Sequence, residues 1–298
     1  MAVPSPAVLT HRLALGASLI ALALVIGWLD GAAERLTGVA GLILAVAAAP
    51  ALTIGAQELA SMLRAKGAEV GAPLAGFSVL AGLAVGSVSA LAPNVDRAGF
   101  LSVPLTAAWL MATLAVLTAR RRTSGAAAAA AGACLIFILL GLIPSSFLVL
   151  RQHESAWTII ALILITKASD IGAYFVGTAA GRRRLIPWLS PGKTWEGLAG
   201  GVAASAGAGA IFGFLAGQGG PIGAIAFPLG PLGAGALGGA LALAGLAGDL
   251  TISLFKRDAG FKDSSALIPG MGGALDVMDS LLFIGPAAHW AILLADRL

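Results

Sequence analysis

The sequence predicts an all-α, polytopic membrane helix bundle, and three features of its composition support this. Of 298 residues, 58% are hydrophobic and only 11% are charged, whereas soluble domains carry about 25% charged residues. The mean hydropathy is +0.95. The hydrophobic residues form runs of about 20 residues, the length of one spanning helix. These features exclude a water-soluble globule and a disordered chain, and the runs lack the alternation of a membrane β-barrel.

Nine hydrophobic runs are expected to be spanning helices. They cover residues 13–29, 38–59, 73–91, 100–119, 126–148, 156–180, 197–217, 232–255 and 276–295. The first run lacks a clear small-x-small cleavage site and more spans follow it, so we do not expect a cleaved signal. We expect one integral membrane domain over 1–298. Its N-terminal helices, to residue 150, provide packing and topology, and residues 156–298 provide catalytic helices and loops.

Basic loop residues predict the orientation of the chain. With the N-terminus in the cytoplasm and alternating loops, 13 of the 18 Lys and Arg residues fall inside and four fall outside, while Lys167 lies within a span. Cytoplasmic loops are enriched in Lys and Arg, so this split predicts an N-in, C-out topology. The same rule explains the net charge of +4. A nucleic-acid partner is therefore not expected.

Ionisable residues within the spans are unevenly distributed. Up to residue 150, Glu58 is the one internal acid. From residue 156 onward, charges lie in or beside the spans at Lys167, Asp170, Asp249, Asp276 and Asp279. A charge at membrane depth costs roughly 2.5–3.5 kcal/mol, so such residues usually pair or line a water-filled cavity. The single cysteine, Cys134, excludes a disulfide framework and a cysteine-based zinc cluster.

The segment from Asp249 to Asp279 combines three requirements of phosphate chemistry. Its carboxylates, Asp249, Asp276 and Asp279, suit Mg²⁺, which usually binds one or two carboxylates together with substrate phosphates. Its basic side chains can neutralise phosphate charge. They are Lys256, Arg257 and Lys262. The glycine-rich stretch 269–273 permits close approach of a ligand and leads into a helix N-terminus, which attracts phosphate.

Each of these parts also has a purely structural explanation. Asp276 and Asp279 share a helix face and would serve equally as helix caps, where acids are favoured. Lys256 and Arg257 alone fit positive-inside anchors. Asp249 is harder to explain in this way, because it follows a long run without any charge. An acid in that position indicates a functional site.

A second cluster lies between the spans at 156–180 and 197–217. Lys167 and Asp170, three residues apart on one helix face, are expected to form an ion pair. Ser190 or Thr194 is expected to cap the following helix. The arginines at 182–184 fit a topogenic role, which leaves the charges within the span unexplained.

The residues of these two segments resemble the CDP-diacylglycerol synthases, also called phosphatidate cytidylyltransferases. The family signature S-x-x-K-R-x4-K-D-x-[small]-x3-P-G-H-G-G-x2-D-R-x-D-S matches at Ser253, Lys256, Arg257, Lys262, Asp263, Pro269, Gly270, Gly272, Gly273, Asp276, Asp279 and Ser280. The upstream element D-x2-A-Y-F-x-G…S-P-x-K-T-W-E-G matches at Asp170, Ala173, Tyr174, Phe175, Gly177, Ser190, Pro191, Lys193, Thr194, Trp195, Glu196 and Gly197. The detailed match covers about residues 165–285. Two long motifs in the right order are far more specific than a lone glycine-rich loop.

The resemblance implies a nucleotidyltransferase of the inner membrane that makes CDP-diacylglycerol and pyrophosphate from CTP and phosphatidate. It implies Mg²⁺ as cofactor and leaves open whether a second, monovalent cation such as K⁺ binds as well. The expected metal ligands are Asp249, Asp276 and Asp279. The expected catalytic residues are Lys256, Arg257, Lys262, Asp263 and Asp279. The expected substrate-binding residues are Lys193, Ser190, Thr194, Gly270, Gly272, Gly273 and Asp170. The expected partners are CTP, phosphatidate and membrane lipid, and the assembly is either a monomer or a homodimer.

Three positions depart from the signature and keep alternatives open. Met271 replaces the usual histidine, Val277 the usual arginine, and Ser265 stands where glycine is common. The loss of an arginine removes a strong phosphate partner, which fits a catalytically weakened paralog. Charges within spans also fit an ion- or proton-coupled transporter. The D-G-x2-A-R…G-x3-D-x3-D pattern of CDP-alcohol phosphotransferases is absent.

Overall fold

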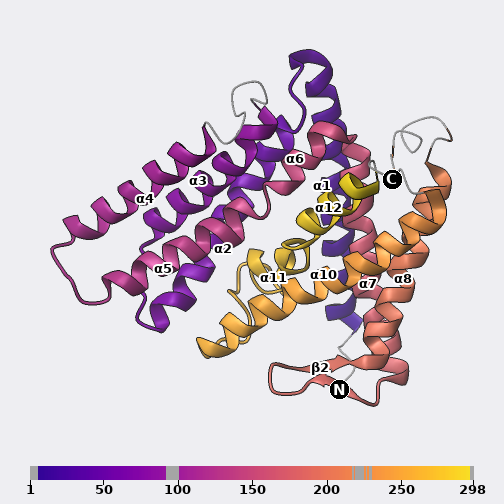
Figure 1. The fold of residues 1–298 in the computed structure, drawn as a ribbon. Coiled ribbons are helices and arrows are strands. Elements are labelled where there is room, and N and C mark those ends of the chain that lie inside the picture. The colour runs from indigo at the N-terminus through magenta and orange to yellow at the C-terminus, as the bar shows by residue number, and fades with distance from the viewer. Residues whose placement is uncertain are drawn as a thin grey trace.

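A computed structural model of the chain describes residues 6–91, 101–216, 218, 225, 227 and 230–295. Helices account for nearly all of this part, and two short strands form a hairpin. Seven of the described helices are long and apolar enough to cross a membrane. The helices run back and forth between two ends of the molecule (Figure 1). The prediction of a mainly helical, multi-pass membrane protein is therefore confirmed.

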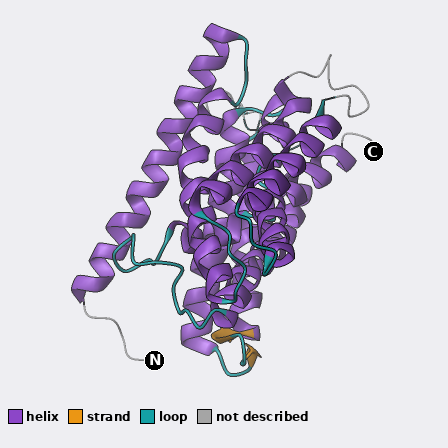
Figure 2. Ribbon diagram, turned by 90° about the vertical axis from the view of Figure 1, so that its left-hand side faces the viewer, coloured by secondary structure: helices purple, strands orange, loops and turns teal. Residues whose placement is uncertain are grey.

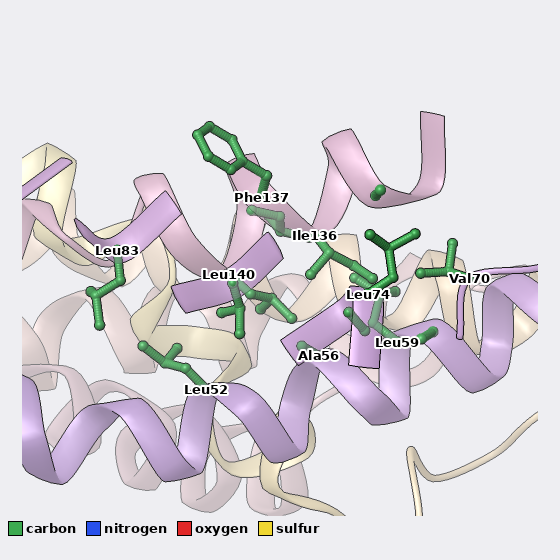
Figure 3. Packing of buried hydrophobic residues seen from close by; sticks show 14 of the residues in the cluster. Leu52, Ala56, Leu59, Val70, Leu74, Leu83, Ile136, Phe137 and Leu140 are labelled. Atoms are coloured by element: carbon green, nitrogen blue, oxygen red, sulfur yellow. The ribbon is translucent and has the colours of Figure 1, made fainter. Parts of the chain in front are cut away.

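The first half is a helical layer built around one hydrophobic core. Its elements are α1 (Pro6–Thr37), α2 (Leu42–Ala65), α3 (Ala72–Leu91), α4 (Ser102–Ala119), α5 (Ala126–Ile136), the π-helix η2 (Phe137–Leu142) and α6 (Ser146–His153). Buried side chains of α2, α3 and η2, such as Leu59, Leu74 and Leu140, meet between the helices (Figure 3). A Cβ atom added at Gly82 would lie 2.3 Å from the carbonyl oxygen of Phe137. Glycine therefore allows α3 to approach the π-helix closely.

The second half contains the hairpin and the remaining helices. Its elements are α7 (Ala156–Ala180), β1 (Arg184–Ile186), β2 (Ser190–Thr194), α8 (Trp195–Leu215), α10 (Gly230–Asp258), α11 (Ala274–Met278), the 3-10 helix η3 (Asp279–Leu281) and α12 (Ile284–Ala295). The two strands form an antiparallel hairpin that connects α7 to α8. The hairpin lies at the lower end of the molecule in Figures 1 and 2.

Small residues let α7, α8 and α10 pack backbone against backbone. A Cβ atom added at Gly238 on α10 would lie 2.3 Å from the carbonyl oxygen of Ser205 on α8. One added at Gly172 on α7 would lie 2.5 Å from the Cβ atom of Ala204. The Ser205 hydroxyl is 2.7 Å from the carbonyl oxygen of Gly238, to which it donates. We call this closely packed set of three helices the small-residue wall.

The predicted span at 276–295 is not a single helix. Asp276 lies in the five-residue α11, Asp279 begins η3, and α12 has only 12 residues. At about 1.5 Å per residue α12 is about 18 Å long, well short of a hydrocarbon core of about 30 Å. Pro286 lies in the first turn of α12, where proline is tolerated, whereas inside one continuous helix it would lack an N–H donor and clash with the preceding turn. The count of nine spans is accordingly not confirmed.

Helix α1 extends beyond the predicted run 13–29 and carries a buried acid that the sequence did not reveal as internal. Asp30 is only 1% exposed and lies 2.8 Å from Arg151 Nε on α6, which is itself 3% exposed. Arg151 also pairs with Glu34 at 2.5 Å. Asp30 further accepts hydrogen bonds from the backbone N–H groups of Gly41, Ile43 and Leu44 at the start of α2. This network joins α1, α2 and α6.

The hairpin lies at one end of the molecule (Figure 1), and Arg184 and Lys193 on its strands make this end basic. Lys66, which follows α2, lies 3.1 Å from Asp258 at the end of α10. Arg257 Nε donates to the carbonyl oxygen of Leu189 in the hairpin at 3.4 Å. Segments that are far apart in the sequence therefore meet at this basic end.

Candidate active site

The hairpin places Lys193 next to Asp249 on α10. Thr194 accepts the Gly197 N–H at 3.0 Å and caps α8, as the sequence predicted. This cap fixes the end of β2, and Lys193 next to it forms an ion pair with Asp249 on α10. Ser253, one turn further along α10, donates to the other oxygen of Asp249 at 3.3 Å. Asp249 remains about one-third exposed, so this pair is open to a ligand.

Asp279 lies beside Asp249. The backbone of η3 approaches α10 so closely that a Cβ atom at Gly248 would lie 2.1 Å from the carbonyl oxygen of Asp279. Burial, and then the neighbouring negative charge of Asp249, raise the pKa of Asp279 to about 8. Two carboxyl groups thus share one side of the site, and one of them holds its proton near neutral pH.

Lys256 and Asp276 form a second, more buried ion pair. Lys256 Nζ lies 2.5 Å from Asp276 Oδ1, with exposures of 11% and 8%. Asp276 Oδ2 accepts the N–H groups of Ser264 and Gly273 at 2.7 and 2.9 Å. It also lies 2.8 Å from the Ser264 hydroxyl, which has one proton to donate and lies within reach of Glu58 as well. Burial raises the pKa of Asp276, but the bonds from Gly273, Lys256 and Ser264 outweigh burial and hold it below its usual value. Asp276 is therefore an ionised carboxylate that also caps α11.

A carboxylate from the first half reaches the same loop. Glu58 on α2 is 7% exposed. Its two oxygens accept hydrogen bonds from the hydroxyls of Ser264 and Ser265 and from the N–H groups of Ala274 and Leu275. Helix α2 is thus fastened directly to the loop that carries Asp276.

The predicted ion pair of α7 is present. Lys167 Nζ lies 3.0 Å from Asp170 and donates to the Ser280 hydroxyl at 3.1 Å. Asp170 is about half exposed, so it lies at the edge of the site and its pairing is weak. Through Lys167, α7 contacts the same turn that carries Asp279.

The glycine-rich turn has a backbone that requires glycine. Gly270 and Gly272 have φ angles of +80° and +92°, in the left-handed region that favours glycine. A Cβ atom at Gly272 would lie 2.3 Å from Asp276 Oδ2. One at Gly273 would lie 2.1 Å from Ser264 Oγ and 2.3 Å from Glu58 Oε1. These glycines therefore pack against the carboxylates, and their contact with a substrate stays a prediction.

The other predicted residues lie around this centre. Arg257 donates to Leu189 and, at 3.2 Å, to the carbonyl oxygen of Phe261, so it ties the hairpin to the loop. Lys262 and Asp263 are exposed and have no hydrogen bond or ion pair with any described residue. Ser190 lies half-buried in β2. Lys262 and Asp263 are thus free to meet a substrate.

The three predicted metal ligands are not gathered into one cluster. Asp249 and Asp279 are neighbours, whereas Asp276 faces Lys256 and the loop. Among the residues that the structure describes, no group of three or more His, Cys, Asp or Glu side chains is placed to hold a metal ion. The assignment of a metal to these residues stays a prediction.

Two residues in this region have roles that were not predicted from the sequence. Glu58 was noticeable as an acid inside a span, but its partners follow it by more than 200 residues. Ser264 lies unremarkably between two motif positions, yet its hydroxyl is within 2.9 Å of both Glu58 and Asp276. For Glu58, the cost of an unpaired charge was the one available signal.

Comparisons with known proteins agree with the motifs. The profile of the cytidylyltransferase family matches residues 11–295. A phosphatidate cytidylyltransferase of Pseudomonas aeruginosa is 39% identical over 188 residues, 61% of this chain and 66% of that protein. One from Haemophilus influenzae is 38% identical over 129 residues, 43% of each chain. The uncharacterized protein YnbB of Escherichia coli is 39% identical over 137 residues, 46% of this chain and 43% of that protein.

The family profile matches more of this chain than any of these three relatives does. The chain covers between 43% and 66% of the length of these three proteins. The profile, by contrast, includes the first half of the chain, where the motifs gave only hydrophobic spans. The resemblance to the CDP-diacylglycerol synthases is confirmed, and the chain belongs to the cytidylyltransferase family.

Proposed function

We propose that this protein is a nucleotidyltransferase that makes CDP-diacylglycerol and pyrophosphate from CTP and phosphatidate, as a step of phospholipid biosynthesis. The observation that carries the proposal is the meeting of Lys193–Asp249, Lys256–Asp276 and Asp279 at the basic end. These residues come from both family motifs, and relatives that match 61% and 43% of this chain are named phosphatidate cytidylyltransferase.

The chemistry needs little from a general base. The nucleophile is a phosphate oxygen of the lipid, which is already deprotonated at pH 7. The main obstacle is repulsion between this anion and the CTP phosphates, so cationic groups are required where charge develops. Lys193 and Lys256 provide such groups, and aspartates hold both in position. The exposed Lys262 adds a third cation, and Asp263 beside it is suited to orienting it.

The carboxylates beside the lysines fit a divalent cation. Asp249 and Asp279 are adjacent, and repulsion between them contributes to the raised pKa of Asp279. A cation that replaces the proton relieves this repulsion, because carboxylate oxygens are the ligands that Mg²⁺ prefers. Asp249 and Asp279 would hold Mg²⁺, with Asp276 nearby as a further acceptor, and K⁺ stays an open second cation. When bound, the metal would neutralise phosphate charge and help to orient the two substrates.

The location of the reaction follows from its substrates. CTP is a cytoplasmic metabolite and phosphatidate is a membrane lipid, so we place the basic end at the cytoplasmic face of the inner membrane. This orientation matches the N-in, C-out prediction. It is tested by labelling single cysteines placed at Arg183 and Lys262 in a Cys134→Ala background. Labelling by an impermeant reagent from outside intact cells would contradict this orientation.

The departures from the family signature bear on rate rather than on reaction type. Ser265 has an evident function, because its hydroxyl donates to Glu58 at 2.7 Å. Met271 and Val277 lack the hydrogen-bond donors of histidine and arginine. We therefore expect weaker substrate binding than in relatives that carry both residues. No observation on the structure favours a transporter over an enzyme.

The decisive experiment is a transfer assay with purified protein in detergent, phosphatidate, labelled CTP and Mg²⁺. We expect a labelled CDP-lipid and one pyrophosphate per lipid product. Chelation of the metal should abolish the product, and the Asp249→Asn variant serves as the matched inactive control. Absence of CDP-lipid under conditions where the Pseudomonas aeruginosa relative forms it would refute the proposal.

A further inference from the structure

Glu58 lies in the first half of the chain, outside both motifs, yet it is bonded to the loop that carries Asp276. We propose that Glu58 is a positioning residue of the transfer reaction. It fixes residues 264–275 to α2 and thereby holds the Asp276–Lys256 pair in place. The catalytic part of this inference rests on the proposed function, whereas the fixing of the loop does not.

The hydrogen bonds of Glu58 fully occupy its carboxylate. Oε1 accepts the Ser265 hydroxyl at 2.7 Å and the Ala274 N–H at 3.1 Å. Oε2 accepts the Ser264 hydroxyl at 2.9 Å and the Leu275 N–H at 2.8 Å. Hydrogen bonds to an ionised acceptor are roughly twice as strong as neutral ones. One buried side chain thus fixes both ends of the segment 264–275.

Two routes lead from Glu58 to the Lys256–Asp276 pair. Ser264 lies between the carboxylates, and its N–H donates to Asp276 Oδ2 at 2.7 Å. Its hydroxyl is 2.8 Å from that oxygen and 2.9 Å from Glu58 Oε2, so the two carboxylates share its one proton. Gly273 donates its N–H to Asp276 at 2.9 Å, while its Cα faces Glu58 so closely that no side chain would fit. Movement of Glu58 would therefore displace the groups that orient Asp276.

The surroundings of Glu58 suit a positioning role and not contact with substrate. The side chain is buried, and Lys256 pairs with Asp276 instead of Glu58. Within the described part of the chain, no lysine or arginine forms an ion pair with Glu58. Its charge is balanced by hydroxyl and N–H donors of one loop. A buried carboxylate with such partners stabilises the conformation of that loop.

The test compares the Glu58→Gln variant with the wild type in hydrogen exchange and in steady-state kinetics. An amide side chain presents a donor where the carboxylate accepts, so some of the four bonds are lost. We expect at least tenfold faster exchange in peptides covering residues 264–276. We expect kcat to fall at least tenfold while KM for CTP changes less than threefold. Glu58→Asp keeps the charge with a shorter side chain and should recover part of kcat.

Asp30→Asn is the matched control, because Asp30 is also a buried acid that caps a helix, but its partners are the start of α2 and Arg151 on α6. It should lower the melting temperature but leave both kcat and loop exchange within twofold of wild type. If Glu58→Gln does not fold, Ser265→Ala removes one of the four donors and should change the same two quantities in the same direction, to a smaller extent.

Each remaining outcome overturns part of the inference. Unchanged exchange in Glu58→Gln would refute the fixing of the loop, whatever happens to kcat. Faster exchange with unchanged kcat would refute the link to the reaction. If the wild type forms no CDP-lipid, the proposed function fails together with the catalytic role. The exchange data would then still decide whether Glu58 orders the loop.

Discussion

Asp30 and Glu58 perform similar local tasks in different parts of the molecule. Each is a buried carboxylate that accepts N–H groups at the start of a helix, α2 for Asp30 and α11 for Glu58. Asp30 is neutralised by Arg151, whereas Glu58 meets only hydroxyl and N–H donors. The first network joins three helices of the scaffold, and the second joins the scaffold to a site loop. Buried charge therefore serves the stability of the scaffold at Asp30 and, in our proposal, the geometry of the site at Glu58.

The largest expected effect is on the scaffold network. Arg151→Met leaves Asp30 buried without its cation, and breaking a buried pair in this way costs about 3–5 kcal/mol. Unfolding of the purified variant in detergent should show this loss, while kcat of the folded fraction stays within twofold of wild type. The double variant Arg151→Met with Asp30→Asn, which removes both charges but keeps a side-chain oxygen for the N–H groups of α2, should recover part of the stability. A selective loss of kcat would show that this network also serves the reaction.

The next largest effect is expected on transfer activity. Asp249→Asn and Asp276→Asn each remove a negative charge that positions a lysine or a metal. Removal of one such electrostatic contact costs about 10²–10³-fold in kcat, or about 2.7–4 kcal/mol. Asp258→Asn is the control, because its pair with Lys66 is exposed on both sides and contributes under about 1 kcal/mol. Near-normal activity of either site variant at saturating Mg²⁺ would contradict the assignment.

Gly273→Ala should disturb the Glu58 network without altering any charge. The added methyl group would meet Ser264 Oγ and the Glu58 carboxylate at 2.1–2.5 Å, and overpacking of this kind costs about 1–3 kcal/mol. We expect lower thermal stability together with a roughly tenfold loss of kcat. Gly207→Ala on α8 is the control, because nothing lies within 4 Å of its new Cβ atom. Equal behaviour of the two variants would argue against close packing at Gly273.

The smallest effect is expected from adding an arginine to the site, as a counterpart of Arg151 in the scaffold network. In the double variant Met271→His with Val277→Arg, arginine adds a fixed charge and up to five donors next to Asp276. We expect a three- to tenfold rise in kcat/KM, about 0.6–1.4 kcal/mol. Steady-state kinetics of the double variant and wild type provide the measurement. An unchanged or lower kcat/KM would mean that other residues already fill this space.

The long apolar helices and the contacts between residues close in the sequence could be predicted from the sequence. Long apolar runs identified most of the long helices, and a three-residue spacing identified the Lys167–Asp170 pair. Residue type and position predicted a cap at Ser190 or Thr194, and Thr194 makes it. Contacts between distant segments were not predictable. Neither the pairing of Asp30 with Arg151 nor that of Glu58 with its loop has a local spacing signal.

The ninth run shows the limit of hydropathy as a predictor. Residues 276–295 are apolar on average, but the chain divides there into α11, η3 and α12. A mean hydropathy does not register single residues, such as Pro286, that a continuous helix would not tolerate. The side chains of the three predicted metal ligands are divided between two places, because Asp276 pairs with Lys256, and the metal assignment itself stays a prediction.

The small-residue wall has a consequence for how this protein tolerates mutation. At Gly172, Gly209 and Gly238 even one methyl group would lie within about 2.5 Å of a neighbouring helix. In a saturation mutagenesis library, these positions should accept no substitution, whereas exposed apolar positions such as Phe214 on the same helices should accept many. Tolerance to substitution along α8 should therefore vary with the period of a helix. The positions that tolerate no substitution would identify the face of α8 that belongs to the small-residue wall, without use of a structure.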